Sequence, residues 1–438
     1  MSTLNDVVIT KLSGGLGRRN PEQDMVSGLL FDGVATTKLA LNKIERLASL
    51  EDAEALGITA DYDVNGQSAY YQIQQFFRMN PSGDLYIMAT TATSYQEIAG
   101  KAMDMQEKAN GNIRQIAIIY SGATTFAQTQ AAILKAQTQA DLAYKDYMPF
   151  EIILEGKGFT IDAASLAGSD AENVSVVVAM DVEKAFAKKL FRKDTLKLYN
   201  LLPNEEVVPL EGDLDLYNVK NADGLKKENG ATIEFIFKDS YKNTAAVGLT
   251  LGAISKAKVS ENIAWIEKFN LTGEGFAKAG FVGGEEFKTL GTLSELNDKR
   301  FIFAKTHTGL PGVYFNDSHT CTLGTSDFAY VENNRTINKA TRLLRTALLP
   351  KLASPVLVDI DGKLPQSVSK SFEGLCRSAL EGMVANQEVS AFDVYVDPKQ
   401  NILATSELKV KAEITPIGTA RKIMVDLGFK NPFGIDKA

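Results

Sequence analysis

The sequence predicts an α/β fold: a mostly parallel sheet core with an inserted surface subdomain, an α+β C-terminal domain and extended terminal β arms. Three observations support this prediction. Apolar segments alternate with amphipathic ones up to residue 180, a polar, lysine-rich stretch interrupts them at residues 182–240, and both ends carry short apolar runs beyond Gly- or Pro-containing breaks. Apolar strands that alternate with helices are typical of βαβ units and parallel sheets.

The first domain is predicted over residues 26–299, after an N-terminal arm at residues 1–25. Its strands are short, apolar runs, which we place at 27–31, 85–89, 113–120, 150–154 and 174–180. Its helices show apolar residues at helical spacing, and we place them at 38–47, 69–78, 95–109, 126–144 and 244–260. The insertion at 182–240 lies between the last strand and the last helix, and its composition favours a surface position.

The C-terminal domain is predicted over residues 300–415. It begins with a hairpin at 300–316 and continues with helices at 333–349 and 368–384. A second hairpin follows, with strands at 391–396 and 406–414. Its second strand alternates Leu408, Val410, Ala412 and Ile414 with charged residues, which indicates one buried and one solvated face.

Both ends of the chain carry short apolar runs that are typical of β-strands without a partner in their own domain. Apolar residues recur at both ends: Val7, Val8, Ile9, Ile423, Met424, Val425 and Leu427. Gly14-Gly15 separates the first run from the core, and Pro416-Ile417-Gly418 begins a C-terminal arm over residues 416–438. An unpaired strand tends to pair with a neighbouring chain, so we expect both arms to pair between subunits.

Composition limits the classes of function. The chain has 438 residues, of which 45% are hydrophobic and 23% charged, so it is long enough for several folded domains. A formal net charge of −7 argues against a general affinity for nucleic acid or anionic membranes. Two cysteines and two histidines are too few for a structural zinc site or a disulfide framework.

The N-terminus carries no pattern of a secretory signal, and no apolar run is long enough to cross a bilayer. The segment MSTLNDVV has neither a basic region nor an apolar one. Runs such as 174–180 are far too short for a membrane span. We therefore expect a protein made in the cytoplasm that does not insert directly into a membrane.

One helix carries an organised charge pattern. In the segment 333–349, Ile337, Leu344 and Leu348 form an apolar stripe. Basic residues form another face without an acidic residue among them: Arg335, Lys339, Arg342 and Arg345. This face is either solvated or in contact with an acidic partner surface.

No set of residues assembles an active site. The run Gly14-Gly15-Leu16-Gly17 lacks the following helix and the Gly-Lys-Ser/Thr of a phosphate loop. Asp317, His319 and Cys321 are too few for a metal site. Ser121 follows a strand and precedes a helix, where α/β proteins bind ligands. We predict no catalytic residue, cofactor or metal, with an α/β enzyme that has a divergent ligand site near Ser121 as one alternative.

The order of segments resembles that of contractile tail sheath proteins of phage tails, tailocins and contractile injection systems. One element of that family is a helix that ends in FF, followed by a glycine turn and a strand. This chain has a similar element in AYYQIQQFF at 69–77, the turn NPSG at 80–83 and the strand LYIM at 85–88. Helix 368–384, the segments VYVD at 394–397 and NIL at 401–403, strand 408–414 and Pro416 resemble the sheath C-terminal domain and its arm. The resemblance covers residues 25–180 and 245–430.

The resemblance implies a virion structural protein rather than an enzyme. Such subunits stack as hexameric rings in a helical assembly around an inner tube, and they contract with energy stored in subunit interfaces. It implies the chain itself, an inner tube protein, and baseplate and tail terminator proteins as partners, with no nucleic acid. The protein would be made in the bacterial cytoplasm and assembled into a tail or injection particle, with the basic face turned towards the tube. Another virion structural protein, such as a capsid or tube component, is a further alternative.

Overall fold

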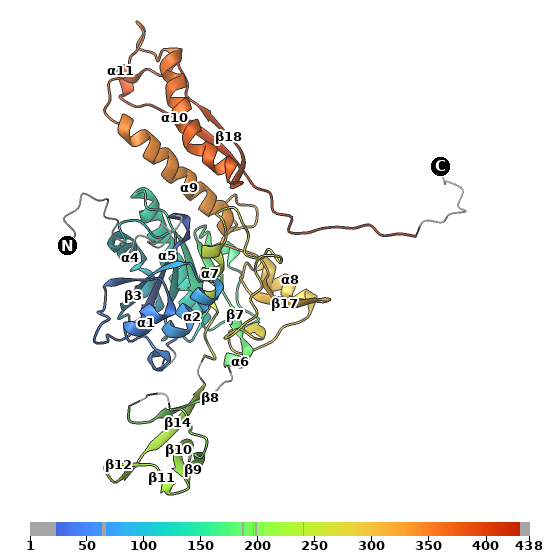
Figure 1. Ribbon diagram of the computed structural model, residues 1–438. Coiled ribbons are helices and arrows are strands. Elements are labelled where there is room, and N and C mark those ends of the chain that lie inside the picture. Colours follow the sequence, from blue (N-terminus) through green and yellow to red (C-terminus); the bar gives the residue numbers. More distant parts are fainter. Residues whose placement is uncertain are drawn as a thin grey trace, which may run out of the picture.

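A computed structural model describes residues 23–63, 67–185, 188–195, 197, 199–239 and 241–429. Its centre is a six-stranded sheet in the order β2-β3-β1-β4-β5-β6 (Figure 1). The strands are β1 (Val26–Asp32), β2 (Ile44–Leu47), β3 (Asp84–Thr90), β4 (Gln115–Ile119), β5 (Glu151–Glu155) and β6 (Val174–Val177). All neighbours in this sheet are parallel except β2, which runs antiparallel to β3. The predicted mostly parallel sheet is confirmed.

Two groups of helices cover this sheet. They are α1 (Leu50–Ala55), α2 (Ala69–Met79), α3 (Tyr95–Ala99), α4 (Ala102–Lys108), α5 (Phe126–Lys145) and α7 (Val247–Lys256), with short 3₁₀ turns η1 (Gln23–Met25), η2 (Ala60–Tyr62) and η3 (Ala167–Ser169). Helices α3, α4 and α5 pack together, and α2 packs on α7. A side chain at Gly248 would lie 2.0 Å from the carbonyl oxygen of Gln72, so glycine permits this close approach.

Residues 257–330 extend the same core. This part contains β15 (Ala279–Phe281), the hairpin β16 (Ala304–His307) and β17 (Leu310–Phe315), and helix α8 (Leu290–Asp298). Strand β15 pairs with β7 (Ala179–Asp181), which α6 (Val182–Ala185) follows in the chain. Phe301, Phe303 and Phe315 belong to the apolar cluster of the central sheet. The domain boundary predicted at residue 300 therefore moves to about residue 330, because the first hairpin packs on the body rather than on the helices that follow.

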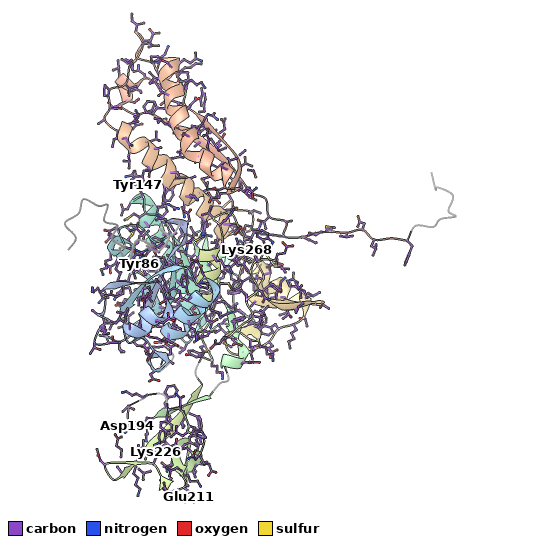
Figure 2. The ribbon with its side chains drawn as sticks, in the orientation of Figure 1. Tyr86, Tyr147, Asp194, Glu211, Lys226 and Lys268 are labelled. Carbon is purple, nitrogen blue, oxygen red and sulfur yellow. The ribbon has the colours of Figure 1, made fainter. Side chains whose placement is uncertain are left out.

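The insertion forms a small β unit with its own core. It contains β8 (Lys188–Arg192), β9 (Glu206–Leu210), β10 (Asp213–Asn221), β11 (Gly224–Leu225), β12 (Lys227–Glu228), β13 (Ala231–Thr232) and β14 (Glu234–Asp239). Leu190, Val219 and Phe235 are its buried centre. The unit projects from the body, away from the C-terminal domain (Figure 1), and carries the labelled Asp194, Glu211 and Lys226 in Figure 2.

The C-terminal domain is a pair of helices and a hairpin. It contains α9 (Val331–Leu348), η4 (Leu349–Lys351), α10 (Gln366–Ala385), β18 (Val389–Tyr395), α11 (Ile402–Thr405) and β19 (Lys411–Pro416). Cys376, Leu380 and Met383 of α10 pack with Ala340 of α9 and with Val394 of β18. The predicted hairpin is present, although its second strand begins at residue 411 rather than 406.

One predicted helix is wrong. Residues 38–43 contain a bend and a turn rather than a helix, and Ile44–Leu47 form strand β2. Asn42 has a left-handed backbone with φ 59°, which interrupts a helix, and Arg46 pairs with Asp84 of β3. Pairing with a neighbouring strand therefore overrides the helical spacing. The predicted helix at 95–109 is also divided, into α3 and α4 around Gly100. The predicted arm strand Val7–Ile9 lies outside the described residues.

The separate core of the insertion predicts that it loses structure without the body. Phe235→Ala removes a fully buried ring, which costs about 3–5 kcal/mol. We expect hydrogen exchange to rise throughout residues 188–239 while the central sheet stays protected, measured by mass spectrometry. Phe276→Ala is the matched control, because Phe276 lies in the body's core. This variant should raise exchange in the central sheet and leave residues 188–239 protected. Equal loss of protection in both parts would contradict the division.

Candidate assembly interface

The C-terminal segment leaves the body as an extended tail. Residues 417–429 have no regular secondary structure in the described chain, and they run away from the hairpin into open space (Figure 1). The large apolar side chains of this segment are exposed: Ile423, Met424, Val425, Leu427 and Phe429. Leu427 is 95% exposed and Phe429 is 109% exposed, so these two contribute no burial within the described subunit. An extended apolar segment of this kind gains stability only when something covers it.

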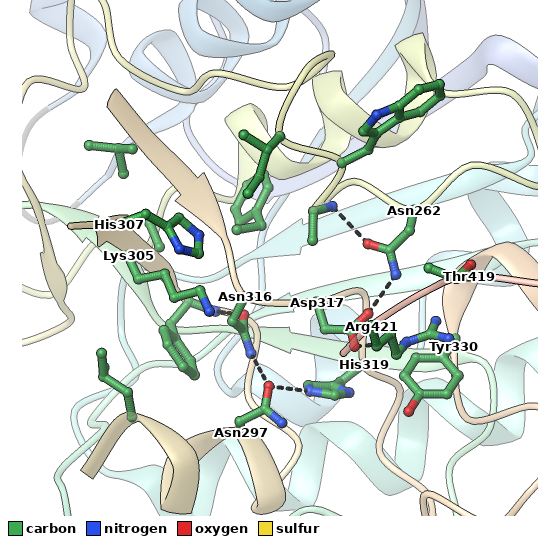
Figure 3. Close-up of a pocket in the computed structure, with 18 of the residues that line it drawn as sticks. Asn262, Asn297, Lys305, His307, Asn316, Asp317, His319, Tyr330, Thr419 and Arg421 are labelled. Atoms are coloured by element: carbon green, nitrogen blue, oxygen red, sulfur yellow. Dashed lines mark hydrogen bonds and ion pairs between the residues drawn. The ribbon is translucent and has the colours of Figure 1, made fainter. Parts of the chain in front are cut away.

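Arg421 fixes the root of this tail to the body. Its Nε donates to Asp317 Oδ2 at 2.9 Å (Figure 3). Its Nη2 donates to Glu332 Oε1. Its guanidinium carbon lies 3.5 Å from the centre of the Tyr330 ring. Asp317 precedes α9 and Glu332 lies in its first turn, so the tail is attached where the body and the C-terminal domain meet.

The carboxylates at this attachment are buried. Asp317 is 7% exposed and Glu332 is 3% exposed. Burial raises the pKa of Glu332, whereas the charge of Arg421 and the hydroxyl of Ser318 lower it. Asn262 Nδ2 also donates to both carboxylates. Arg421 therefore compensates buried negative charge, and its loss would leave that charge without a cation.

A groove lies beside the anchored tail. Its volume is about 2040 Å³, and its lining includes Trp265, Leu290, Leu323, His307 and Ile423. The first three of these side chains are partly or largely exposed: Trp265 by 47%, Leu323 by 59% and Leu290 by 86%. The groove is therefore open, and exposed apolar side chains as well as charged ones such as Lys305 and Asp317 line it next to the point where the tail departs.

The C-terminal hairpin has unpaired edges. In the described chain, β18 and β19 pair only with each other, antiparallel from Ala391–Thr415 to Tyr395–Lys411. Each strand can therefore accept a further strand along its outer edge. The tail begins directly after β19, so subunits with the same structure present both a free extended segment and free strand edges.

The predicted open basic face on α9 is not present. Arg335 is 4% exposed and donates to the carbonyl oxygens of Ala257, Lys258 and Asp24. Lys339 bonds to Asp24 and Glu388, both at 2.6 Å, and Arg342 pairs with Asp24. The expectation that these three meet a tube is corrected, because they hold α9 on its own body.

Arg345, the fourth residue of that face, is partly exposed and lies over Tyr147. Its guanidinium carbon is 3.5 Å from the ring centre, and Tyr147 is labelled in Figure 2 where the body meets the C-terminal domain. The sequence could not reveal these contacts, because Asp24, Tyr147 and Ala257 are distant along the chain.

A buried carboxylate completes the contact between α9 and the sheet. Glu151, at the start of β5, accepts hydrogen bonds from Asn338 Nδ2 at 2.9 Å, Asn173 Nδ2 at 3.0 Å and Asn334 Nδ2 at 3.3 Å. Burial raises the pKa of Glu151 to about 8, against the lowering effect of these amides and of Arg335.

The side chains that could take part in chemistry are buried or hydrogen-bonded within the fold: Ser121, His319 and Cys321. Ser121 donates its backbone N–H and its hydroxyl to the carboxylate of Asp32, at the carboxyl edge of the sheet. His319 Nε2 lies 2.9 Å from Asn297 Oδ1, and burial lowers the pKa of His319 to about 3. Burial also raises the pKa of the Cys321 thiol, so this cysteine is a poor nucleophile.

The described residues provide neither a metal cluster nor a membrane span. Within these ranges, no group of three or more His, Cys, Asp or Glu side chains is placed to hold a metal ion. No helix in the same ranges combines the length and the apolar character needed to cross a bilayer.

Comparison with known families covers nearly the whole chain. The model of the DUF2586 N-terminal domain matches residues 4–319, and that of the DUF2586 C-terminal domain matches residues 327–434. The chain belongs to the DUF2586 family. The family boundary lies close to the start of α9, in agreement with the packing of the DUF2586 core. Among curated proteins, no sequence matches this chain.

The DUF2586 chain has the fold of contractile sheath proteins. It matches the helical sheath of the anti-feeding prophage in its contracted state with a TM-score of 0.57 and 12% identity, over 98% of this chain and 100% of that chain. A chain of the anti-feeding prophage baseplate matches with a TM-score of 0.58, 12% identity and the same coverage. The PVC sheath complex of an extracellular contractile injection system, also contracted, matches with a TM-score of 0.55 and 11% identity over 98% of both chains. The predicted resemblance is confirmed at the level of the fold.

Sequence reasoning found the apolar tail of this DUF2586 chain but missed its anchor. Arg421 stands alone in the sequence, and its partners lie 104 and 89 residues away. No local pattern marks such a residue. The buried partners Asp317 and Glu332 were likewise invisible, because a single carboxylate in a sequence carries no sign of burial.

The anchor predicts that Arg421 controls the order of the tail root. Arg421→Met should destabilise the chain by about 1–3 kcal/mol and increase amide exchange at residues 417–421, because two buried carboxylates lose their cation. Urea unfolding and hydrogen exchange would measure these effects. Lys422→Met, which removes the same charge from the next residue, should change neither. Equal behaviour of the two variants would refute the anchor.

The pKa of Glu151 predicts a pH dependence of stability. A carboxyl with a folded pKa of about 8 and an ordinary value of 4.5 binds its proton more tightly in the folded state. The contribution of Glu151 to the free energy of unfolding is therefore full below about pH 4.5 and is lost as the pH rises through about 8. Glu155, whose pKa burial raises to about 7, acts in the same direction.

We therefore expect the urea midpoint of the wild-type chain to fall between pH 6 and pH 9. This fall should be smaller for Glu151→Gln, and Glu295→Gln, an exposed carboxyl, should behave as wild type. A Glu151→Gln profile identical to that of the wild type would show that Glu151 is ionised throughout this range.

Proposed function

We propose that this chain is the structural subunit of a contractile tail sheath. The main evidence is the C-terminal tail, which is apolar, anchored at its root and followed in space by no other part of the described chain, beside a hairpin with free edges. The match to sheath folds along the whole chain supports the same reading. In this proposal the subunits form stacked hexameric rings around an inner tube, and contraction drives that tube through a target envelope.

Strand pairing explains how such subunits stay joined while they move. The tail residues Ile423, Met424, Val425 and Leu427 would form a strand along the β18–β19 hairpin of a neighbouring subunit. The N-terminal residues Val7, Val8 and Ile9 would form another inter-subunit strand. Backbone hydrogen bonds between strands are directional but independent of side-chain detail, so a paired arm can act as a hinge while the bodies rotate.

The bodies would store the energy of contraction. Packed interfaces have discrete arrangements, and a change from one to the other can release energy without nucleotide hydrolysis. The insertion at 188–239 projects away from the body, so we place it on the outside of the cylinder (Figure 1). The tube contact falls on a surface other than Arg335, Lys339 and Arg342, since these have partners within the chain.

The remaining partners follow from the same assembly. We infer that baseplate and tail terminator proteins contact the two ends of the stack, and that the subunit needs no nucleic acid, cofactor or direct membrane insertion. Synthesis in the bacterial cytoplasm followed by assembly into a tail or injection particle fits this role.

Tail variants test the proposal. Deletion of residues 422–438 should leave a folded monomer that forms no cylinders by electron microscopy, because the free hairpin edges lose their partner strand. Val425→Pro should reduce assembly at least tenfold, since proline removes a ladder donor and disfavours a strand interior. Val425→Thr, which preserves a β-branched side chain and the N–H, should assemble normally. Normal cylinders from the deletion variant would overturn the proposal. Deletion of residues 1–12 applies the same test to the N-terminal arm.

A further inference from the structure

The groove beside the tail root has a buried aromatic part and an exposed apolar rim. Phe281, Phe303 and Phe315 line it and belong to the core cluster of the body. Its other large apolar side chains are half-exposed or more accessible still: Trp265, Ile266, Leu290 and Leu323. Because the core holds the phenylalanine rings, the groove keeps its shape without an occupant.

The size of the groove favours a segment of polypeptide as its occupant. Its volume is about 2040 Å³. Pockets for small molecules usually measure about 300–1,000 Å³. A single small ligand would therefore leave most of the exposed apolar rim uncovered, whereas an extended peptide segment would cover it.

Several charged side chains in the lining already have partners. Lys278 and Lys288 both pair with Glu286. Asp317 pairs with Arg421 at the tail root. A segment that enters the groove therefore needs an apolar face and little charge of its own.

The tail carries such a face. Every second residue is apolar and exposed: Ile423, Val425, Leu427 and Phe429. In an extended segment these alternate side chains point to one side, and the side chains of Met424 and Asp426 point to the other. Asp426 is the one charged residue within 423–429, so its carboxylate can stay in water while the apolar face is covered.

The tail already starts in the groove. Residues 417–421 and Ile423 belong to its lining, and Arg421 holds this root on Asp317 and Glu332. The described residues 422–429 form neither a hydrogen bond nor an ion pair. In an extended conformation, residues 423–429 reach about 20 Å. A rotation of the backbone next to Arg421 therefore decides whether the apolar face points into the groove or into solvent.

We propose that the tail of an unassembled subunit folds back into this groove, so that residues 423–429 cover Trp265, Leu290 and Leu323 of their own chain. The structure shows the released position of the tail, in which its apolar face meets no protein (Figure 1). Burial of two exposed apolar surfaces against each other drives the closure. The anchor at Arg421 makes the contact intramolecular, which raises the effective concentration of the tail at the groove.

The closed tail is an autoinhibitory strap. A tail that lies in its own groove cannot pair with the β18–β19 hairpin of another subunit. This consequence rests on the proposed function, in which that pairing joins the subunits of a cylinder. Exposed edges and free apolar segments invite unspecific association, and closure of the strap protects a free subunit from it.

The single tryptophan of the chain reports the position of the strap. Trp265 is 47% exposed when the tail is released. Quenching of its fluorescence by acrylamide in dilute, unassembled protein should be about twofold weaker for the wild-type chain than for a variant that lacks residues 422–438, since the closed strap covers the exposed part of the indole. Equal quenching of the two proteins would overturn the proposal.

Two exposed leucines give a matched pair of variants. Leu290 lines the groove and is 86% exposed, whereas Leu352 lies in the C-terminal domain outside the groove and is 78% exposed. Leu290→Asp should raise quenching to the level of the tail deletion, and Leu352→Asp should leave it at the wild-type level. In the tail-deleted chain Leu290→Asp should have no effect, because the strap is already absent. Equal effects of the two substitutions in the full chain would contradict capture by the groove.

A peptide tests recognition of the apolar face directly. The peptide of residues 421–429, added at about 1 mM to replace the lost effective concentration, should restore the protection of Trp265 in the tail-deleted chain. The same peptide with serine at positions 423, 425, 427 and 429 should not restore it. Protection by both peptides, or by neither, would overturn the proposal.

The remaining outcomes separate this inference from the proposed function. Protection in the wild-type chain should not change with protein concentration while sedimentation shows a monomer; protection that arises only together with a dimer would overturn capture within one chain. Tail-dependent protection without cylinders under any condition would support the strap and refute the sheath role. Cylinders without tail-dependent protection of the free subunit would refute the strap and support the sheath role.

Discussion

The attachment of α9 to the central sheet is the constraint on which the arrangement of the domains depends. Asn334 and Asn338 donate to the buried carboxylate of Glu151, and Arg335 donates to carbonyl oxygens of the body. Apolar packing alone is non-directional and would allow a helix to slide or rotate. Hydrogen bonds to buried polar groups are costly to break and fix one orientation. The C-terminal domain is therefore held at a defined angle on the body.

The position of α9 also fixes the point at which the tail leaves the body. Glu332 lies in the first turn of α9, Asp317 follows β17 of the body, and both bind Arg421. The root of the tail is consequently positioned by the same few residues that position the domain. The proposed sheath role uses this combination: a rigid body, a segment that leaves it at a fixed point, and a hairpin with free edges. The insertion contributes to none of these contacts, because its core is separate.

The buried charges at this boundary have a second consequence. Paired buried ions rarely add much stability, since removal from water costs nearly as much as the attraction returns. They do make the boundary specific, because a displaced α9 would leave Glu151, Asp24 or the arginines without partners. A boundary of this kind has few intermediate states, which suits a protein whose proposed role is to move between two arrangements.

Local sequence patterns predicted the periodic elements. Apolar runs at β1, β3, β4 and β5 and amphipathic spacing at α2, α5 and α10 predicted the sheet and its helices, because burial of whole faces leaves a local pattern. The apolar tail after Pro416 was visible for the same reason. Contacts between distant parts of the folded chain, in contrast, determine that Ile44–Leu47 pairs as a strand, that residues 300–330 belong to the body, and that Arg335, Lys339 and Arg342 turn inwards. Arg421 and Glu151 were equally hidden. The partners of all these residues lie far away along the chain, and a charged side chain in a sequence does not reveal whether water or another charge will surround it.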